Sequence, residues 1–163
     1  MKLELKHLAP YLPYGLPIEP IYKSTFMGGY NQRILDTSIL DNYELEEIKP
    51  ILRPLSDLTK EIEFNGEKFT PLCILTKQQF DKDNESVFDD ENLYLIEDDK
   101  YCYPSNGDKT SYYWLSYNER MQRFDSCDTT DLNQLNLLNT LLEWHFDVFG
   151  LIEQGLAIDI NTL

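Results

Sequence analysis

Residues 131–149 read DLNQLNLLNTLLEWHFDVF and carry the strongest periodic pattern in the chain. Apolar residues return there every three or four positions, the spacing that places side chains on one face of an α-helix. The residues of this stripe are Leu132, Leu135, Leu138, Leu141, Leu142, His145 and Phe149. Asp131, or Thr130 before it, is a suitable N-cap, and Gly150 is a suitable stop. The pattern predicts one long C-terminal amphipathic helix over about 131–149.

The rest of the sequence predicts short elements. Pro10 and Pro13 favour extended structure after one helical turn at 5–9, because proline fixes φ and has no N–H to donate. Ser56 precedes apolar residues at helical spacing, which predicts a short helix near 56–63. Strands are expected at 18–26, 33–40, 68–75 (interrupted by Pro71), 93–97, 101–103, 110–117 and 157–160, with turns at Asn65-Gly66 and Asp98-Asp99-Lys100.

These elements predict a single α+β domain over residues 1–163. A chain of 163 residues can bury one hydrophobic core, and the sequence contains no repeat and no Gly/Ser-rich linker. We expect an antiparallel sheet of short strands beside the long C-terminal helix and the short helix near 56–63. Residues 81–92 are polar and acidic without a clear period, which predicts an acidic loop within this domain.

The net charge is strongly negative and unevenly distributed. The chain has 29 Asp and Glu against 14 Lys and Arg, for a formal charge of −15. Residues 81–99 hold nine acids and one base, and residues 125–163 hold seven acids and no base. Direct binding to DNA or RNA is therefore not expected, because a polyanion would need a strong basic patch.

Three interpretations of residues 81–99 are open. The first is a solvated loop that aids solubility. The second is a calcium loop, since Asp81, Asp83, Glu85 and Asp89 have the spacing of EF-hand ligands, but Ser86 and Asn92 stand where that loop needs Gly and a bidentate Glu. The third is an electrostatic surface for a basic protein partner, whose association it would accelerate.

Motifs for catalysis, cofactors and metals are not found. The sequence contains no Gly-x-Gly-x-x-Gly, no Walker loop and no Gly-x-Ser-x-Gly elbow. Cys73, Cys102 and Cys127 are widely spaced, and His7 and His145 have no metal-ligand spacing. We therefore predict a non-enzymatic protein without catalytic residues, metal or cofactor.

The expected location is the cytoplasm of a bacterial host cell. No apolar run is long enough to cross a bilayer, and Met1-Lys2-Leu3-Glu4 does not begin a signal peptide. An odd number of isolated cysteines fits a reducing compartment.

Three segments carry a resemblance. LKHLAPYLPYGL at 5–16, ILRPLSDL at 51–58 and EWHFDVFGLI at 143–152, followed by AIDI at 157–160, resemble a family of small phage and prophage proteins of Bacteroidetes. That family has no established activity and no catalytic residues to transfer. The resemblance implies a small accessory protein of a mobile element. Small acidic phage proteins often bind host or defence enzymes, sometimes as nucleic-acid mimics, and anti-CRISPR proteins are one such class.

The predicted function is therefore binding and modulation of a basic, nucleic-acid-handling protein, such as a CRISPR effector. Carboxylates supply the charge, and two tyrosines supply contact area as anchors. The predicted partner-binding residues are Asp81, Asp83, Glu85, Asp89, Asp90, Glu91, Glu97, Asp98, Asp99, Tyr101 and Tyr103.

Two alternatives stay open. The protein could instead be an accessory factor of phage DNA replication or recombination that works within a phage-encoded complex. It could also be a hydrolase that uses a metal held by acidic side chains, which predicts stabilisation by divalent cations. The sequence identifies neither the partner nor the oligomeric state.

Overall fold

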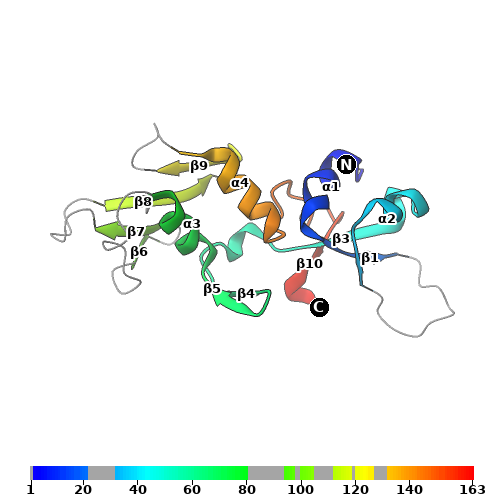
Figure 1. Cartoon of the computed structure of the whole chain (residues 1–163), viewed down its shortest axis with the longest axis horizontal. Helices are drawn as coiled ribbons and strands as arrows, with labels where there is room; N and C mark the ends of the chain where they lie inside the picture. The colour runs from blue at the N-terminus through cyan, green and yellow to red at the C-terminus, as the bar shows by residue number, and fades with distance from the viewer. Residues whose placement is uncertain are drawn as a thin grey trace. The chain divides into compact units, whose positions relative to one another are not determined.

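The computed structural model describes residues 2–21, 32–80, 94–97, 100–104, 112–118, 120–126 and 132–163, with only the backbone described at 94–97, 100–104 and 112–114. The chain divides into two units (Figure 1). Unit 1 comprises residues 1–55 and 139–163, and unit 2 comprises residues 56–138. Both combine helices with short strands, so the α+β class predicted from the sequence is confirmed.

Unit 1 contains a four-stranded sheet of order β10-β3-β1-β2. Its strands are β1 (Pro17–Pro20), β2 (Arg33–Ile34), β3 (Ile48–Leu52) and β10 (Ile158–Asp159). β1 pairs antiparallel with β2 and β3, whereas β10 pairs parallel with β3. The sheet is thus mixed rather than purely antiparallel, because its last strand joins from a distant part of the chain.

Short helices occupy places where extended structure was expected. α1 (Leu5–Leu8) continues into the 3-10 helix η1 (Ala9–Tyr14). Pro10 is tolerated because it lies in the first turn, where its missing N–H would have no partner within the helix. α2 (Thr37–Asn42) replaces the second half of the strand predicted at 33–40, because Asp36 caps it by accepting a 2.9 Å hydrogen bond from Ile39 N–H. The 3-10 turn η2 (Leu45–Glu47) leads into β3.

The prediction of one long C-terminal helix over about 131–149 is wrong. α4 covers only Gln134–Glu143. His145 has a left-handed φ of 60°, which a continuing helix cannot accommodate. Arg53 N–H then donates to the His145 carbonyl oxygen and the Arg53 carbonyl accepts from Asp147 N–H, both at 2.8 Å, so that Arg53 and Phe146 form a parallel bridge. Residues 145–147 therefore do not continue α4, because their backbone groups are hydrogen-bonded to Arg53.

The turn after this bridge depends on the buried carboxylate of Asp147. Its two oxygens accept hydrogen bonds from the N–H groups of Leu151 and Ile152, each at 2.8 Å. Burial raises the pKa of Asp147, and the backbone hydrogen bonds oppose that rise. The carboxylate therefore organises the chain between the end of α4 and β10.

The 3-10 turn η3 (Leu55–Asp57) leads from unit 1 into unit 2. A hairpin of β4 (Ile62–Phe64) and β5 (Glu67–Phe69) follows. The short helix predicted near 56–63 is therefore reduced to one turn, because Ile62 belongs to a strand. The Asn65-Gly66 turn is confirmed, with left-handed φ values of 52° and 83°. The strand predicted at 68–75 ends at Phe69.

α3 (Pro71–Phe80) follows, with Pro71 as its first residue, where the helix needs no N–H from it. The sheet of unit 2 has the order β6-β7-β8-β9, and all its pairs are antiparallel. Its strands are β6 (Tyr94–Glu97), β7 (Lys100–Pro104), β8 (Tyr112–Asn118) and β9 (Arg123–Ser126). α3 packs against β7 and β8. The predicted β6–β7 hairpin and the predicted aromatic strand are confirmed, whereas the acidic loop at 81–92 lies outside the described residues.

The left-handed backbone at residue 145 predicts that glycine at this position gives a more stable protein than alanine. His145→Gly and His145→Ala both remove the imidazole, but only alanine keeps a Cβ that is strained at positive φ. We expect the glycine variant to have the higher free energy of unfolding, by about 1 kcal/mol. Urea denaturation of the two variants measures this difference, and equal stabilities would contradict a left-handed backbone at this position.

Replacing Asp147 should reduce stability in a pH-dependent way. At neutral pH, Asp147→Ala should lower the free energy of unfolding by about 1–3 kcal/mol, because buried N–H donors lose their acceptor. The folded-state pKa is raised above the ordinary 3.8, so the folded state binds the proton more tightly than the unfolded state. The wild-type advantage should therefore be largest at acid pH and decline as pH rises through the folded-state pKa. An advantage that instead grows with pH would show that the pKa is lowered.

Candidate functional site

The predicted acidic site is only partly within the described residues. Glu97 ends β6, and Tyr101 and Tyr103 lie in β7. The register pairs Glu97 with Lys100, so Asp98 and Asp99 are the two residues that connect these strands. The other predicted site residues lie outside the described ranges: Asp81, Asp83, Glu85, Asp89, Asp90 and Glu91. We call residues 81–99 the acidic segment.

The tyrosine anchors occupy defined register positions. Tyr101 is paired with Leu115, and Tyr103 with Tyr113. Leu115 is completely buried. Tyr101 therefore stands opposite a core residue of unit 2. The anchor role of the two tyrosines stays a prediction.

In the second acidic tract, at 125–163, three of the described acids are hydrogen-bonded within local structure. Asp125 accepts from Arg123 Nε at 3.0 Å and from Asn118 Nδ2 at 3.2 Å. Asp147 is the buried acceptor of the turn after α4, and Asp159 accepts from the Asn161 N–H at 2.9 Å. Glu143 and Glu153 are exposed. The described acids of this tract thus do not act as one group.

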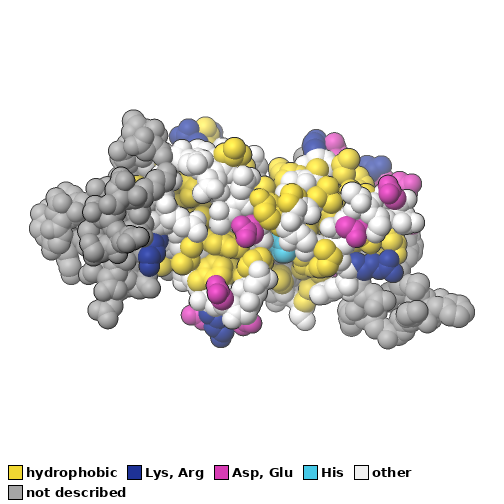
Figure 2. All heavy atoms as spheres, viewed as in Figure 1, with side chains coloured by type: hydrophobic (Ala, Val, Ile, Leu, Met, Phe, Trp, Pro, Cys, Tyr) yellow, Lys and Arg dark blue, Asp and Glu magenta, His cyan; other side chains and the backbone are white. Residues whose placement is uncertain are grey.

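Acidic and basic side chains alternate elsewhere. At the β4–β5 hairpin, Glu63 is the register partner of Lys68, and both side chains are exposed. Asp57, although buried, accepts from Lys60 Nζ at 2.7 Å. Figure 2 shows acidic and basic side chains interspersed on the face in view. The described surface on that face carries no extended area of a single charge.

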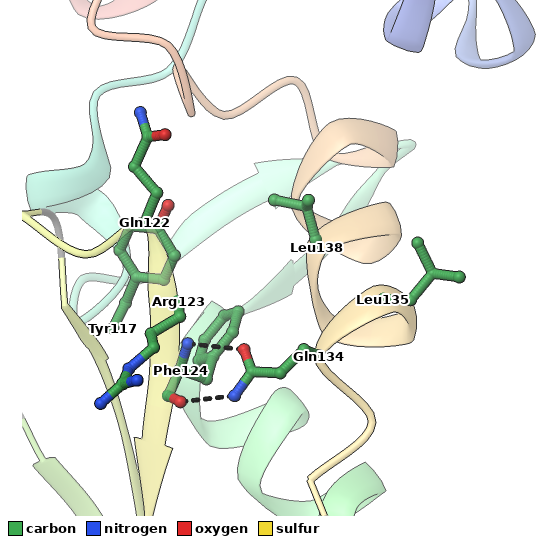
Figure 3. Close-up of a pocket in the computed structure, with 7 residues that line it drawn as sticks. All are labelled: Tyr117, Gln122, Arg123, Phe124, Gln134, Leu135 and Leu138. Carbon is green, nitrogen blue, oxygen red and sulfur yellow. Dashed lines mark hydrogen bonds between the residues drawn. The ribbon is translucent and has the colours of Figure 1, made fainter.

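An apolar pocket of about 230 Å³ lies in unit 2 between the β8–β9 hairpin and the start of α4. The rings of Tyr117 and Phe124 meet edge to face, with 5.0 Å between their centroids. Leu138 points from α4 toward the hairpin, whereas Leu135 points away from it (Figure 3). The lining residues are Tyr117, Gln122, Arg123, Phe124, Gln134, Leu135 and Leu138. The pocket can accept a small apolar group.

Gln134 joins α4 to the hairpin beside this pocket. Its Nε2 donates to the Phe124 carbonyl oxygen at 2.6 Å, and its Oε1 accepts from the Phe124 N–H at 2.8 Å (Figure 3). The backbone N–H and C=O of Phe124, in the edge strand β9, are therefore both hydrogen-bonded to the side chain of Gln134. Gln134 was not predicted from the sequence, because a glutamine in the first turn of a helix has no distinctive pattern.

A second, polar pocket of about 460 Å³ lies in unit 1 around α2. The Arg33 guanidinium carbon lies 5.4 Å from the centroid of the Tyr43 ring, a cation–π geometry. The lining residues are Arg33, Ser38, Ile39, Asn42, Tyr43 and Glu47. Arg33 and Glu47 are the only charged groups of the lining, so the pocket combines one positive and one negative charge.

The two histidines have structural environments. His145 Nε2 donates to the Tyr14 carbonyl oxygen at 2.9 Å, and burial lowers the pKa of His145 below its ordinary 6.5. His7 Nδ1 accepts from the Glu4 N–H at 3.1 Å, and its ring lies 5.7 Å from that of Phe149. Among the residues that the structure describes, no group of His, Cys, Asp and Glu could hold a metal ion.

Comparison with known proteins gives no relative, since no family model, no curated protein and no solved structure matches the chain. Every helix within the described ranges is too short or too polar to span a membrane.

The pocket walls should differ sharply in their tolerance to substitution. Phe124 is 2% exposed and Leu135 is 69% exposed. Phe124→Ala should lower the free energy of unfolding by about 3–5 kcal/mol, because it leaves a cavity in the core of unit 2. Leu135→Ala should change it by no more than about 0.5 kcal/mol. Chemical denaturation of both variants tests this, and a similar loss for the two would contradict their difference in burial.

Proposed function

We propose that the protein is a non-enzymatic binding protein whose acidic segment engages a basic surface of a nucleic-acid-handling partner. The observation that carries the proposal is the charge of residues 81–99, where nine carboxylates occur with the single base Lys82. Surfaces that hold nucleic acid are clusters of Lys and Arg that neutralise phosphates. A dense series of carboxylates offers such a cluster the same kind of charge.

Three acids of the second acidic tract have local roles in the part of the chain that the structure describes. Asp125 and Asp159 are hydrogen-bonded to neighbouring groups of their own strand or turn, and Asp147 is buried. The remaining described acids of this tract, Glu143 and Glu153, are exposed. The acidic segment is the candidate for an electrostatic contact because it has the higher charge density, with nine carboxylates in residues 81–99 against seven in residues 125–163.

The β6–β7 hairpin gives this segment a fixed end. Glu97 and Lys100 close the hairpin register, with Asp98 and Asp99 between them in the sequence. The hairpin is continuous with β8 and β9 through antiparallel pairs, and α3 packs on β7 and β8. A charge cluster attached to a sheet loses less conformational freedom on binding than one in a free chain, which favours affinity.

The test compares two variants, each with six carboxylates replaced by the corresponding neutral amides. One variant carries Asp→Asn or Glu→Gln at six positions of the acidic segment: Asp89, Asp90, Glu91, Glu97, Asp98 and Asp99. The matched control carries the same changes at six exposed acids elsewhere: Asp41, Glu61, Glu63, Glu67, Glu143 and Glu153. Both variants lose six negative charges, so a difference between them reports position rather than net charge.

Each immobilised protein is incubated with a bacterial lysate, and duplex DNA is then used to displace what is bound. Wild type and control should retain nucleic-acid-binding proteins that the DNA releases. The acidic-segment variant should lose them, with association to an isolated partner slowed roughly tenfold or more at low salt and little salt dependence left. Equal loss in both variants would reduce the acidic segment to a source of net charge. Unchanged binding in both would refute the electrostatic proposal.

A further inference from the structure

Among the residues that the structure describes, the outer edge of β9 is covered at Phe124 by a side chain and not by a strand. In an antiparallel sheet, a residue at an edge offers its N–H and C=O to the next strand. At Phe124 both groups are instead bound to Gln134, at 2.8 Å and 2.6 Å. A carboxamide carries the same donor and acceptor as a peptide group. Gln134 thus takes the hydrogen bonds that one residue of an added strand would make.

The register of the β8–β9 pair agrees with Phe124 backbone groups that point away from β8. Phe124 is the partner of Tyr117 across the β8–β9 pair, and their ring centroids are 5.0 Å apart. Because the Phe124 backbone groups are bonded outward, this is a non-hydrogen-bonded pair, the type in which side chains lie closest. Arg123 and Asp125 flank Phe124, two residues apart on the same face of the strand.

We infer that β9 is a latent strand-addition site for a second copy of this chain, and that Gln134 keeps the site closed. The occupant follows from the self-complementary charge of the strand. In a two-fold antiparallel pair centred on Phe124, Arg123 lies directly opposite Asp125 of the second copy, and Asp125 lies opposite its Arg123. Opposite charges at directly opposed positions stabilise a strand pair, and two hydrogen bonds between the Phe124 backbones replace those to Gln134.

The surroundings of Gln134 on α4 include both open space and buried side chains. A space of about 230 Å³ lies between the hairpin and α4 beside Gln134, whereas Leu137 of the same helical turn is buried. Leu135, the next residue, is exposed and points away from the hairpin (Figure 3). The carboxamide of Gln134 covers the edge at Phe124, and its loss frees the N–H and C=O of that residue for pairing with another strand.

The experiment removes the closing side chain and measures mass in solution. Gln134→Ala and the shorter Gln134→Asn both lose the bidentate contact, and Asn139→Ala is the matched control at an exposed position of α4. Light scattering after size exclusion, over a hundredfold range of concentration, should show dimers for both Gln134 variants and no change in mass between wild type and control. Folded Gln134 variants with the wild-type mass at every concentration would overturn the inference, and Gln134→Asn decides if Gln134→Ala does not fold.

Charge reversal identifies the interface. In the Gln134→Ala or Gln134→Asn background, Arg123→Asp places two aspartates opposite each other in the proposed pair and should abolish the dimer. Adding Asp125→Arg restores opposite charges and should restore the dimer. A dimer that survives Arg123→Asp unchanged forms through another surface and refutes the proposed site.

Discussion

Unit 1 is organised around the backbone bridge between Arg53 and Phe146. Its two 2.8 Å hydrogen bonds bring the end of β3 to the residues that follow α4. Tyr11 reaches the same place, since its hydroxyl donates to the Phe146 carbonyl oxygen at 2.6 Å. Three stretches that lie far apart in the sequence, around Tyr11, Arg53 and Phe146, therefore meet at one point of unit 1.

The turn that follows this bridge contains Asp147, a carboxylate that is not available for binding a partner. Because the chain must turn directly after the bridge, Asp147 is buried as the acceptor for Leu151 and Ile152. A residue that adds to the acidic tract in the sequence is therefore a structural group in the fold. Net charge counted along a sequence overstates the charge of a surface wherever carboxylates serve as caps. The proposal for the acidic segment rests on the charge of residues 81–99 and does not count Asp147.

The errors in the predicted fold have both local and tertiary causes. The Asn65-Gly66 turn and the β6–β7 hairpin are fixed by residues within a few positions, and both were predicted from them. The helix predicted to Phe149 stops at Glu143, because the Arg53 bridge is invisible to periodicity. Pro71 was interpreted as a strand interruption, although a first-turn proline equally begins a helix. The contact of Gln134 with Phe124 joins α4 to β9, so the sequence pattern of neither element predicts it.

The electrostatic role of the acidic segment can be tested by a nuclear magnetic resonance titration of the isotopically labelled protein with a short polyarginine peptide. If the acidic segment is the binding surface, backbone amide shifts should change at residues 81–104, while those near Glu143, Glu153 and Asp41 stay unchanged. Changes of equal size around every exposed carboxylate would mean that the chain attracts cations only through its total charge, and would contradict the proposed binding surface.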